Sequence, residues 1–119
     1  SVAHSKQVCA KPVSRNVWRL ESVLEHWDEL RMASYATIEG REEVYQQGGV
    51  TGLLHPADLL RRFGLDATRL APGQAMLCGT LPVKGEVRAA EAFRVVLTDP
   101  VNGRELEHRY LVKTLPVVA

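Results

Sequence analysis

A glycine and a threonine that follow a short apolar run are the first candidates for chemistry in this 119-residue chain. The apolar run, Ala75–Cys78, comes after the turn signal Pro72-Gly73 and is followed directly by Gly79 and Thr80. A short apolar run between turn signals predicts a strand buried on both faces, here over residues 74–80. Glycine lets a ligand approach the backbone, and threonine can both donate and accept a hydrogen bond. We therefore expect Gly79 and Thr80 to bind a small polar ligand at the end of this strand.

A lysine and a histidine near the N-terminus supply the charge that such a ligand would need. A lysine beside a threonine hydroxyl can hold the carboxylate of a small oxo acid through a charge-assisted hydrogen bond. Lys6, with His4 two positions before it, is the candidate. Each of these residues taken alone is more typical of a surface or a turn, but together His4, Lys6, Gly79 and Thr80 predict an anion site.

The two cysteines do not form a redox motif or a metal motif. Cys9 and Cys78 are far apart and belong to no Cys-x-x-Cys pattern, which favours reduced thiols. Cys78 lies in the apolar run, where we expect inert packing. Cys9 has Lys6 and Lys11 near it in the sequence, but a spectator thiol is the preferred interpretation over a nucleophile.

Metal ligands are sparse in the sequence. The four histidines are isolated and have none of the spacings of zinc motifs. Glu105 and Glu107 place two carboxylates on one face of a predicted strand, as a site for a hard metal would require. Alternating charge beside a hairpin turn is also typical of a strand that faces solvent, and we prefer that interpretation. No metal ligands are therefore assigned to this chain.

Composition excludes some classes of partner. The formal net charge of +1 gives no electrostatic reason to expect binding to nucleic acid. No apolar segment approaches the roughly 20 residues needed to cross a bilayer, so no membrane partner is expected. Together with the reduced cysteines and the absence of a secretion signal, this favours a cytoplasmic protein.

The periodicity of apolar residues predicts an α+β fold rich in strands, with two short helices and no repeats. Apolar positions recur at helical spacing from about Val17 to Leu30, and Pro56 begins a second helix that Gly64 would terminate. Residues 1–14 are expected to be extended or a loop. Besides the run at 74–80, alternating patterns predict two hairpins: residues 32–38 with 44–47 around a turn at 39–41, and residues 93–98 with 105–115 around Asn102-Gly103.

Three stretches resemble the C-terminal half of the fumarylacetoacetate hydrolase superfamily, in particular an uncharacterised bacterial branch known as a domain of unknown function. The segment from Ala71-Pro72-Gly73 to Gly85, with Gly79-Thr80-Leu81-Pro82 inside it, is similar to the family's Pro-Gly-Asp, apolar strand, Gly-Thr-Pro and glycine loop. Residues 30–47, with Ile38-Glu39-Gly40-Arg41 and Gln46 or Gln47, resemble its hairpin with Asn-Gly and a following Gln. His4-Ser5-Lys6 resembles its Ala-Lys-Ser phrase, whose lysine lies at the active site.

The resemblance implies a mixed β-roll or sandwich, usually dimeric, in a protein that hydrolyses, decarboxylates or isomerises small oxo acids and diketones. It implies a bound Mg²⁺, Mn²⁺ or Ca²⁺ that acts as a Lewis acid. By resemblance, Lys6 is the catalytic residue, and Gly79, Thr80 and His4 contact a small oxo-acid ligand.

The sequence also departs from the family pattern. The family's metal-ligand carboxylates precede the lysine phrase, so residues 1–119 are expected to be a single domain cut from the C-terminal part of a longer catalytic domain. Mg²⁺ or Mn²⁺ would then belong to the full-length parent, and this chain alone would be inactive. Gln74 replaces the first Asp, and Ala89-Ala90-Glu91 replaces a second Pro-Gly-Asp. A non-catalytic domain for small-molecule binding or dimerisation is therefore the alternative.

Overall fold

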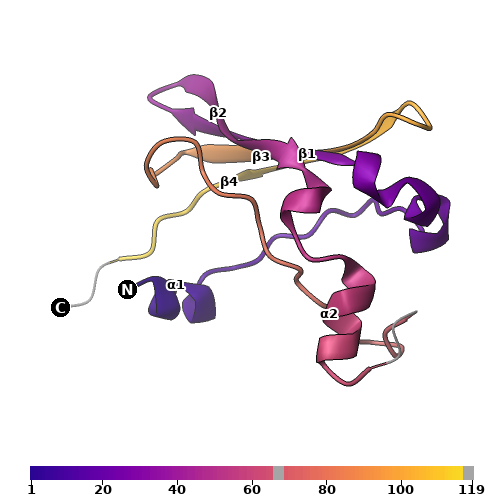
Figure 1. Cartoon of the computed structure of the whole chain (residues 1–119). Coiled ribbons are helices and arrows are strands. Elements are labelled where there is room, and N and C mark those ends of the chain that lie inside the picture. The colour runs from indigo at the N-terminus through magenta and orange to yellow at the C-terminus, as the bar shows by residue number, and fades with distance from the viewer. Residues whose placement is uncertain (66–68, 117–119) are drawn as a thin grey trace.

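A four-stranded antiparallel sheet is the centre of the fold (Figure 1). In the computed structural model, which describes residues 1–65 and 69–116, the strands are ordered β2-β1-β3-β4. Their bounds are β1 Arg31–Ile38, β2 Arg41–Gly49, β3 Ala92–Asp99 and β4 Arg104–Leu111. The helices are α1 Val2–Val8 and α2 Pro56–Arg62, with three 3-10 turns, η1 Leu20–Ser22, η2 Leu24–Glu29 and η3 Val50–Gly52. The predicted α+β, strand-rich fold class is confirmed.

Both predicted hairpins are present. Ile38 pairs with Arg41, and Glu39 and Gly40 between them have φ values of 51° and 78°. Two consecutive positive φ values define the type I′ turn, whose twist matches that of the flanking strands. In the second hairpin Gly103 has φ 60° and closes the turn before β4. Strand β4 ends at Leu111, four residues earlier than predicted.

The loop of the β3–β4 hairpin is held by a buried aspartate. The side chain of Asp99 has no exposed surface, and its Oδ1 accepts hydrogen bonds from the backbone N–H groups of Val101 and Asn102. Its carboxylate also lies 2.8 Å from His26 Nε2 and accepts from Arg104 Nε at 3.1 Å. This cluster fastens the hairpin loop to η2.

The predicted continuous helix from Val17 to Leu30 is wrong, because this segment forms the separate turns η1 and η2. The carbonyl oxygen of Ser22 accepts from the side chains of Asn102 and Arg104 at 3.4 and 3.5 Å. In a continuous α-helix it would instead accept from the backbone N–H of His26, which donates to Val23 O. The hairpin loop therefore competes for the hydrogen bond that an α-helix would need.

Of the two α-helices that the structure describes, α2 was predicted correctly and α1 was not. Helix α2 begins at Pro56 as predicted, and Gly64 follows it with φ 71°. The N-terminal segment was expected to be extended or a loop, but Val2–Val8 is helical. The side chain of Ser1 caps this helix by accepting from the backbone N–H of His4, a type of cap that stabilises a helix start.

The predicted strand over residues 74–80 is also wrong. Within residues 1–65 and 69–116 this segment has no strand partner, and Leu77 has 75% of its surface exposed. A strand needs backbone partners along its length. Among the described residues, the backbone hydrogen bond to the β2 edge comes only later, where Lys84 N donates to Tyr45 O.

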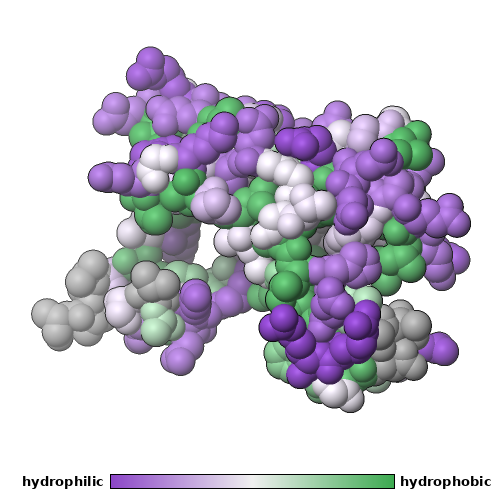
Figure 2. All heavy atoms as spheres, viewed as in Figure 1, coloured by the Kyte–Doolittle hydropathy of each residue, from purple (hydrophilic) through white to green (hydrophobic). Residues whose placement is uncertain are grey.

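The core is small and lies where η1, η2 and η3 meet the sheet. Its buried residues are Val23, Leu30 and Val50, and the partly buried side chains of Trp18, Trp27, Met32 and Leu97 pack against them. Figure 2 shows that hydrophobic side chains also reach the surface between the sheet and α2. In the described ranges no helix combines the length and the apolarity that crossing a membrane requires.

Candidate small-molecule site at Gln46 and Thr80

Thr80 lies at a cavity between the sheet and the segment that follows α2. The cavity has a volume of about 210 Å³. Its floor is apolar, from strands β1 and β3, and its polar groups are the side chains of Ser34, Gln46 and Thr80. The lining residues are Met32, Ala33, Ser34, Gln46, Thr80, Leu81, Val95, Val96 and Leu97. A few polar groups over an apolar floor are typical of a small-molecule site.

The three polar side chains form one hydrogen-bond chain. Ser34 Oγ donates to Gln46 Oε1 at 2.7 Å. Gln46 Nε2 donates to Thr80 Oγ1 at 2.7 Å and to the carbonyl oxygen of Leu81 at 2.5 Å. Ser34 is 4% exposed, so the buried end of the chain is satisfied inside the protein while Thr80 is exposed. The amide of Gln46 is thereby fixed in one orientation.

This hydrogen-bond chain determines what the site can offer to a ligand. Both N–H groups of Gln46 are used, and the proton of Ser34 is directed to Gln46. Thr80 Oγ1 accepts one hydrogen bond and keeps its own O–H to donate. A ligand with an acceptor oxygen, such as a carbonyl or a carboxylate, is therefore the complement of Thr80.

Two features of the fold bring Gln46 and Thr80 together. The register between β1 and β2 shifts between Ser34 and Tyr35, where Tyr45 is an additional residue and Ser34 faces Gln46. Gly79 has φ 99°, a backbone conformation that side-chain-bearing residues rarely adopt. A Cβ at Gly79 would meet only Leu53 Cδ2, at 3.9 Å. The glycine is thus required by its backbone conformation rather than by a close approach.

Lys6 and His4, the other two predicted site residues, lie on α1. Figure 1 shows this helix apart from the sheet, at the end of a long extended segment. Both residues are exposed, and neither lines the cavity at Thr80. The backbone oxygen of Lys6 accepts a hydrogen bond from Lys11 Nζ. The structure therefore places Thr80 at the candidate site, whereas Gly79 lies directly before it in the chain and is not a lining residue. The combination of these residues with Lys6 and His4 stays a prediction.

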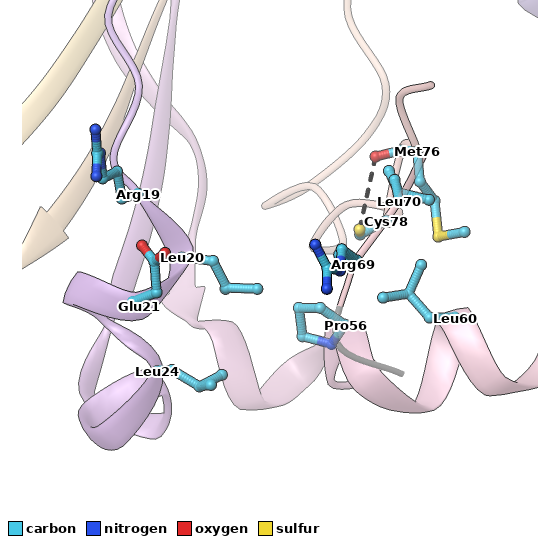
Figure 3. A pocket seen from close by; sticks show the side chains of 10 residues that line it. All are labelled: Arg19, Leu20, Glu21, Leu24, Pro56, Leu60, Arg69, Leu70, Met76 and Cys78. Carbon is cyan, nitrogen blue, oxygen red and sulfur yellow. Dashed lines mark hydrogen bonds between the residues drawn. The ribbon is translucent and has the colours of Figure 1, made fainter. Parts of the chain in front are cut away.

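A larger open cavity lies between η1 and α2 (Figure 3). Its volume is about 680 Å³, and Leu20, Leu24, Leu60 and Met76 are among its apolar lining residues. Cys78 lines it as well and is exposed, so the expected burial of this thiol is wrong. Its thiol lies 3.7 Å from the carbonyl oxygen of Met76.

Glu107, one of the two acidic residues of β4, takes part in ion pairs. Glu107 Oε1 accepts from Arg109 Nε at 2.7 Å, and this hydrogen bond lowers the pKa of the Glu107 carboxyl. Arg94 contacts Glu107 at 3.5 Å and makes three hydrogen bonds to Glu42. Within the described residues no group of three or more histidine, cysteine or acidic side chains could hold a metal ion. Glu105 and Glu107 accordingly lie on an exposed sheet face rich in ion pairs.

Ser34 was missed by residue-level analysis of the sequence, and Gln46 entered it only through the family resemblance. One signal was available for Ser34, because it is a polar residue in the alternating set Met32, Ser34, Ala36 that faces the apolar side of β1. A buried polar residue in such a row needs a partner. Its partner could not be located without knowing the register of β2.

Comparison with known proteins identifies a family for this chain. The chain matches the family described as "Protein of unknown function (DUF2848)" over residues 1–110. The chain therefore belongs to this family. No curated protein and no solved structure matches it.

Proposed function

We propose that this chain is part of a fumarylacetoacetate hydrolase-like protein and that the cavity at Gln46 and Thr80 binds a small oxo acid. The resemblance in the lysine phrase, the hairpin and the Gly-Thr segment supports the family and the class of ligand. The observation that carries the proposal is the hydrogen bond from Gln46 to Thr80, which leaves the Thr80 hydroxyl as a donor at a cavity of about 210 Å³. An oxo acid supplies acceptor oxygens to this donor and a short carbon chain to the apolar floor.

The remaining parts of this proposal rest on the resemblance. Lys6 is proposed as the catalytic residue of the parent protein, with His4 as a further ligand contact. Mg²⁺ or Mn²⁺ would be held by carboxylates outside residues 1–119. The protein is proposed to be cytoplasmic and dimeric.

Calorimetric titration with oxalate and pyruvate tests the site at Thr80. Replacing Thr80 by valine keeps the shape and removes the hydroxyl, so affinity should fall by about tenfold or more, as expected for a hydrogen bond to a charged acceptor. Thr114→Val is the matched control, since Thr114 is exposed and does not line the cavity. Equal affinity of the Thr80→Val variant and the unchanged protein would refute the site.

A separate titration tests the proposed lysine. In the full-length parent, Lys6→Ala should weaken oxalate binding, whereas Lys113→Ala, which removes another exposed lysine, should not. A loss of affinity in Thr80→Val without one in Lys6→Ala would retain the cavity and exclude Lys6 from it.

A further inference from the structure

Strand β4 forms one edge of the sheet, and no other strand of the described part of the chain lies beside its outer backbone groups. It is the last strand in the order β2-β1-β3-β4. In the described residues no backbone hydrogen bond reaches residues 105–111 from outside the sheet. The opposite edge differs, because Lys84 N donates to Tyr45 O on β2. An uncovered edge strand is a template for pairing with another strand.

The register of β3 with β4 shows which backbone groups face outward. Val112 N donates to Glu91 O, and the same register continues through Ala92 opposite Leu111 to Asp99 opposite Arg104. In an antiparallel pair, residues alternate between those whose N–H and C=O face the partner and those whose groups face away. The even-numbered residues of β4 therefore face β3, and residues 105, 107, 109 and 111 present their N–H and C=O at the free edge.

A second copy of β4 can pair with this edge in a register that places opposite charges across from each other. We propose that two copies of the chain pair antiparallel along β4, with a two-fold axis at His108, to form a continuous sheet. Glu107 of each copy then lies opposite Arg109 of the other, in a hydrogen-bonded pair. Registers centred on Glu107 or Arg109 place two like charges opposite each other, and one centred on Leu106 pairs Glu105 with Glu107. Opposite charges across strands stabilise pairing and like charges destabilise it.

The side chains are compatible with this register on both faces of the sheet. Glu107 and Arg109 lie on the exposed face, where they pair with each other within the chain at 2.7 Å. Their side chains are still 45% and 66% exposed, so the side chains of a second copy can reach them. On the other face Leu106 of one copy lies opposite Tyr110 of the other, and both are only half-buried in the single chain. The two copies of His108 meet on the axis as a pair without backbone hydrogen bonds. This surface is distinct from the cavity at Thr80, so its test does not depend on the proposed ligand.

Charge-reversal variants test the register. Glu107→Arg alone places arginine opposite Arg109 in both pairs, and Arg109→Glu alone places glutamate opposite Glu107. In sedimentation velocity experiments the unchanged protein should dimerise with increasing concentration, and each variant should dimerise at least about tenfold more weakly. An equimolar mixture should recover the dimer, because the two arginines of one variant then lie opposite the two glutamates of the other. A monomeric unchanged protein, variants that dimerise normally, or a mixture without recovery would overturn the proposal.

Disulfide trapping locates the axis independently. In a Cys9→Ser, Cys78→Ser background, His108→Cys should form a covalent dimer under mild oxidation, because the two Cβ atoms lie across a non-hydrogen-bonded pair. Glu105→Cys is the control, since residue 105 of each copy lies opposite Leu111 of the other. Equal cross-linking of both variants would contradict an axis at residue 108.

Discussion

At the residue scale, the buried carboxylate of Asp99 is expected to contribute to the thermal stability of the fold. Burial alone raises the pKa of its carboxyl, but hydrogen bonds from Asn102, His26 and Arg104 together hold that pKa below its ordinary value. Asp99→Asn removes the charge that these donors stabilise and should lower the melting temperature by on the order of 10 °C. Asp58→Asn, at an exposed i,i+3 pair with Arg61, is the control and should change it by less than about 2 °C.

The same residue predicts how stability depends on pH. Because its pKa is lower in the folded protein, Asp99 stabilises the fold fully above the pKa of an ordinary aspartate, about 4. This stabilisation is lost as the pH falls through that value toward the lower pKa of the folded state. Urea unfolding should therefore show the difference between the unchanged protein and Asp99→Asn shrinking below about pH 4. A difference that stayed constant down to about pH 2 would contradict the assignment.

At the scale of elements, two substitutions in the β1–β2 turn are expected to change the free energy of unfolding in opposite directions. Glu39 has φ 51°, in the left-handed region where asparagine is tolerated and β-branched residues are strained. Glu39→Asn should increase the free energy of unfolding by about 0.5–1 kcal/mol, and Glu39→Val should decrease it by about the same amount. Chemical denaturation measures both, and a change of the same sign in both variants would exclude backbone strain as the cause.

Elements that depend on local chemistry were predicted well from the sequence, and elements that depend on distant partners were not. The two hairpin turns were predicted from residues that favour turns, and Glu39, Gly40 and Gly103 adopt positive φ there. The run Ala75–Cys78 has the composition of a buried strand, but no strand that the structure describes pairs with it. The helix predicted from Val17 to Leu30 is wrong for a similar reason, because the carbonyl oxygen of Ser22 accepts hydrogen bonds from the distant side chains of Asn102 and Arg104.

The candidate site was only partly predictable for the same reason. Thr80 was identified because a hydroxyl directly after a glycine is a local signal. Its partner Gln46 is 34 positions away in the sequence and reaches it through the β2 register. Ser34 joins the site because the same register places it opposite Gln46. Residue types thus predicted the polar end of the site, whereas strand pairing determined which side chains complete it.

At the scale of the whole molecule, stability should depend on the small core beneath η1 and η2 rather than on the apolar run after α2. Leu30 is 1% exposed and packs with Val23 and Val50, whereas Leu77 is 75% exposed. Leu30→Ala should lower the free energy of unfolding by about 2–5 kcal/mol through lost burial and a cavity. Leu77→Ala removes the same atoms and should change it by less than about 0.5 kcal/mol. Urea denaturation of the two variants side by side measures this contrast, and comparable losses would show that the apolar run is buried in solution.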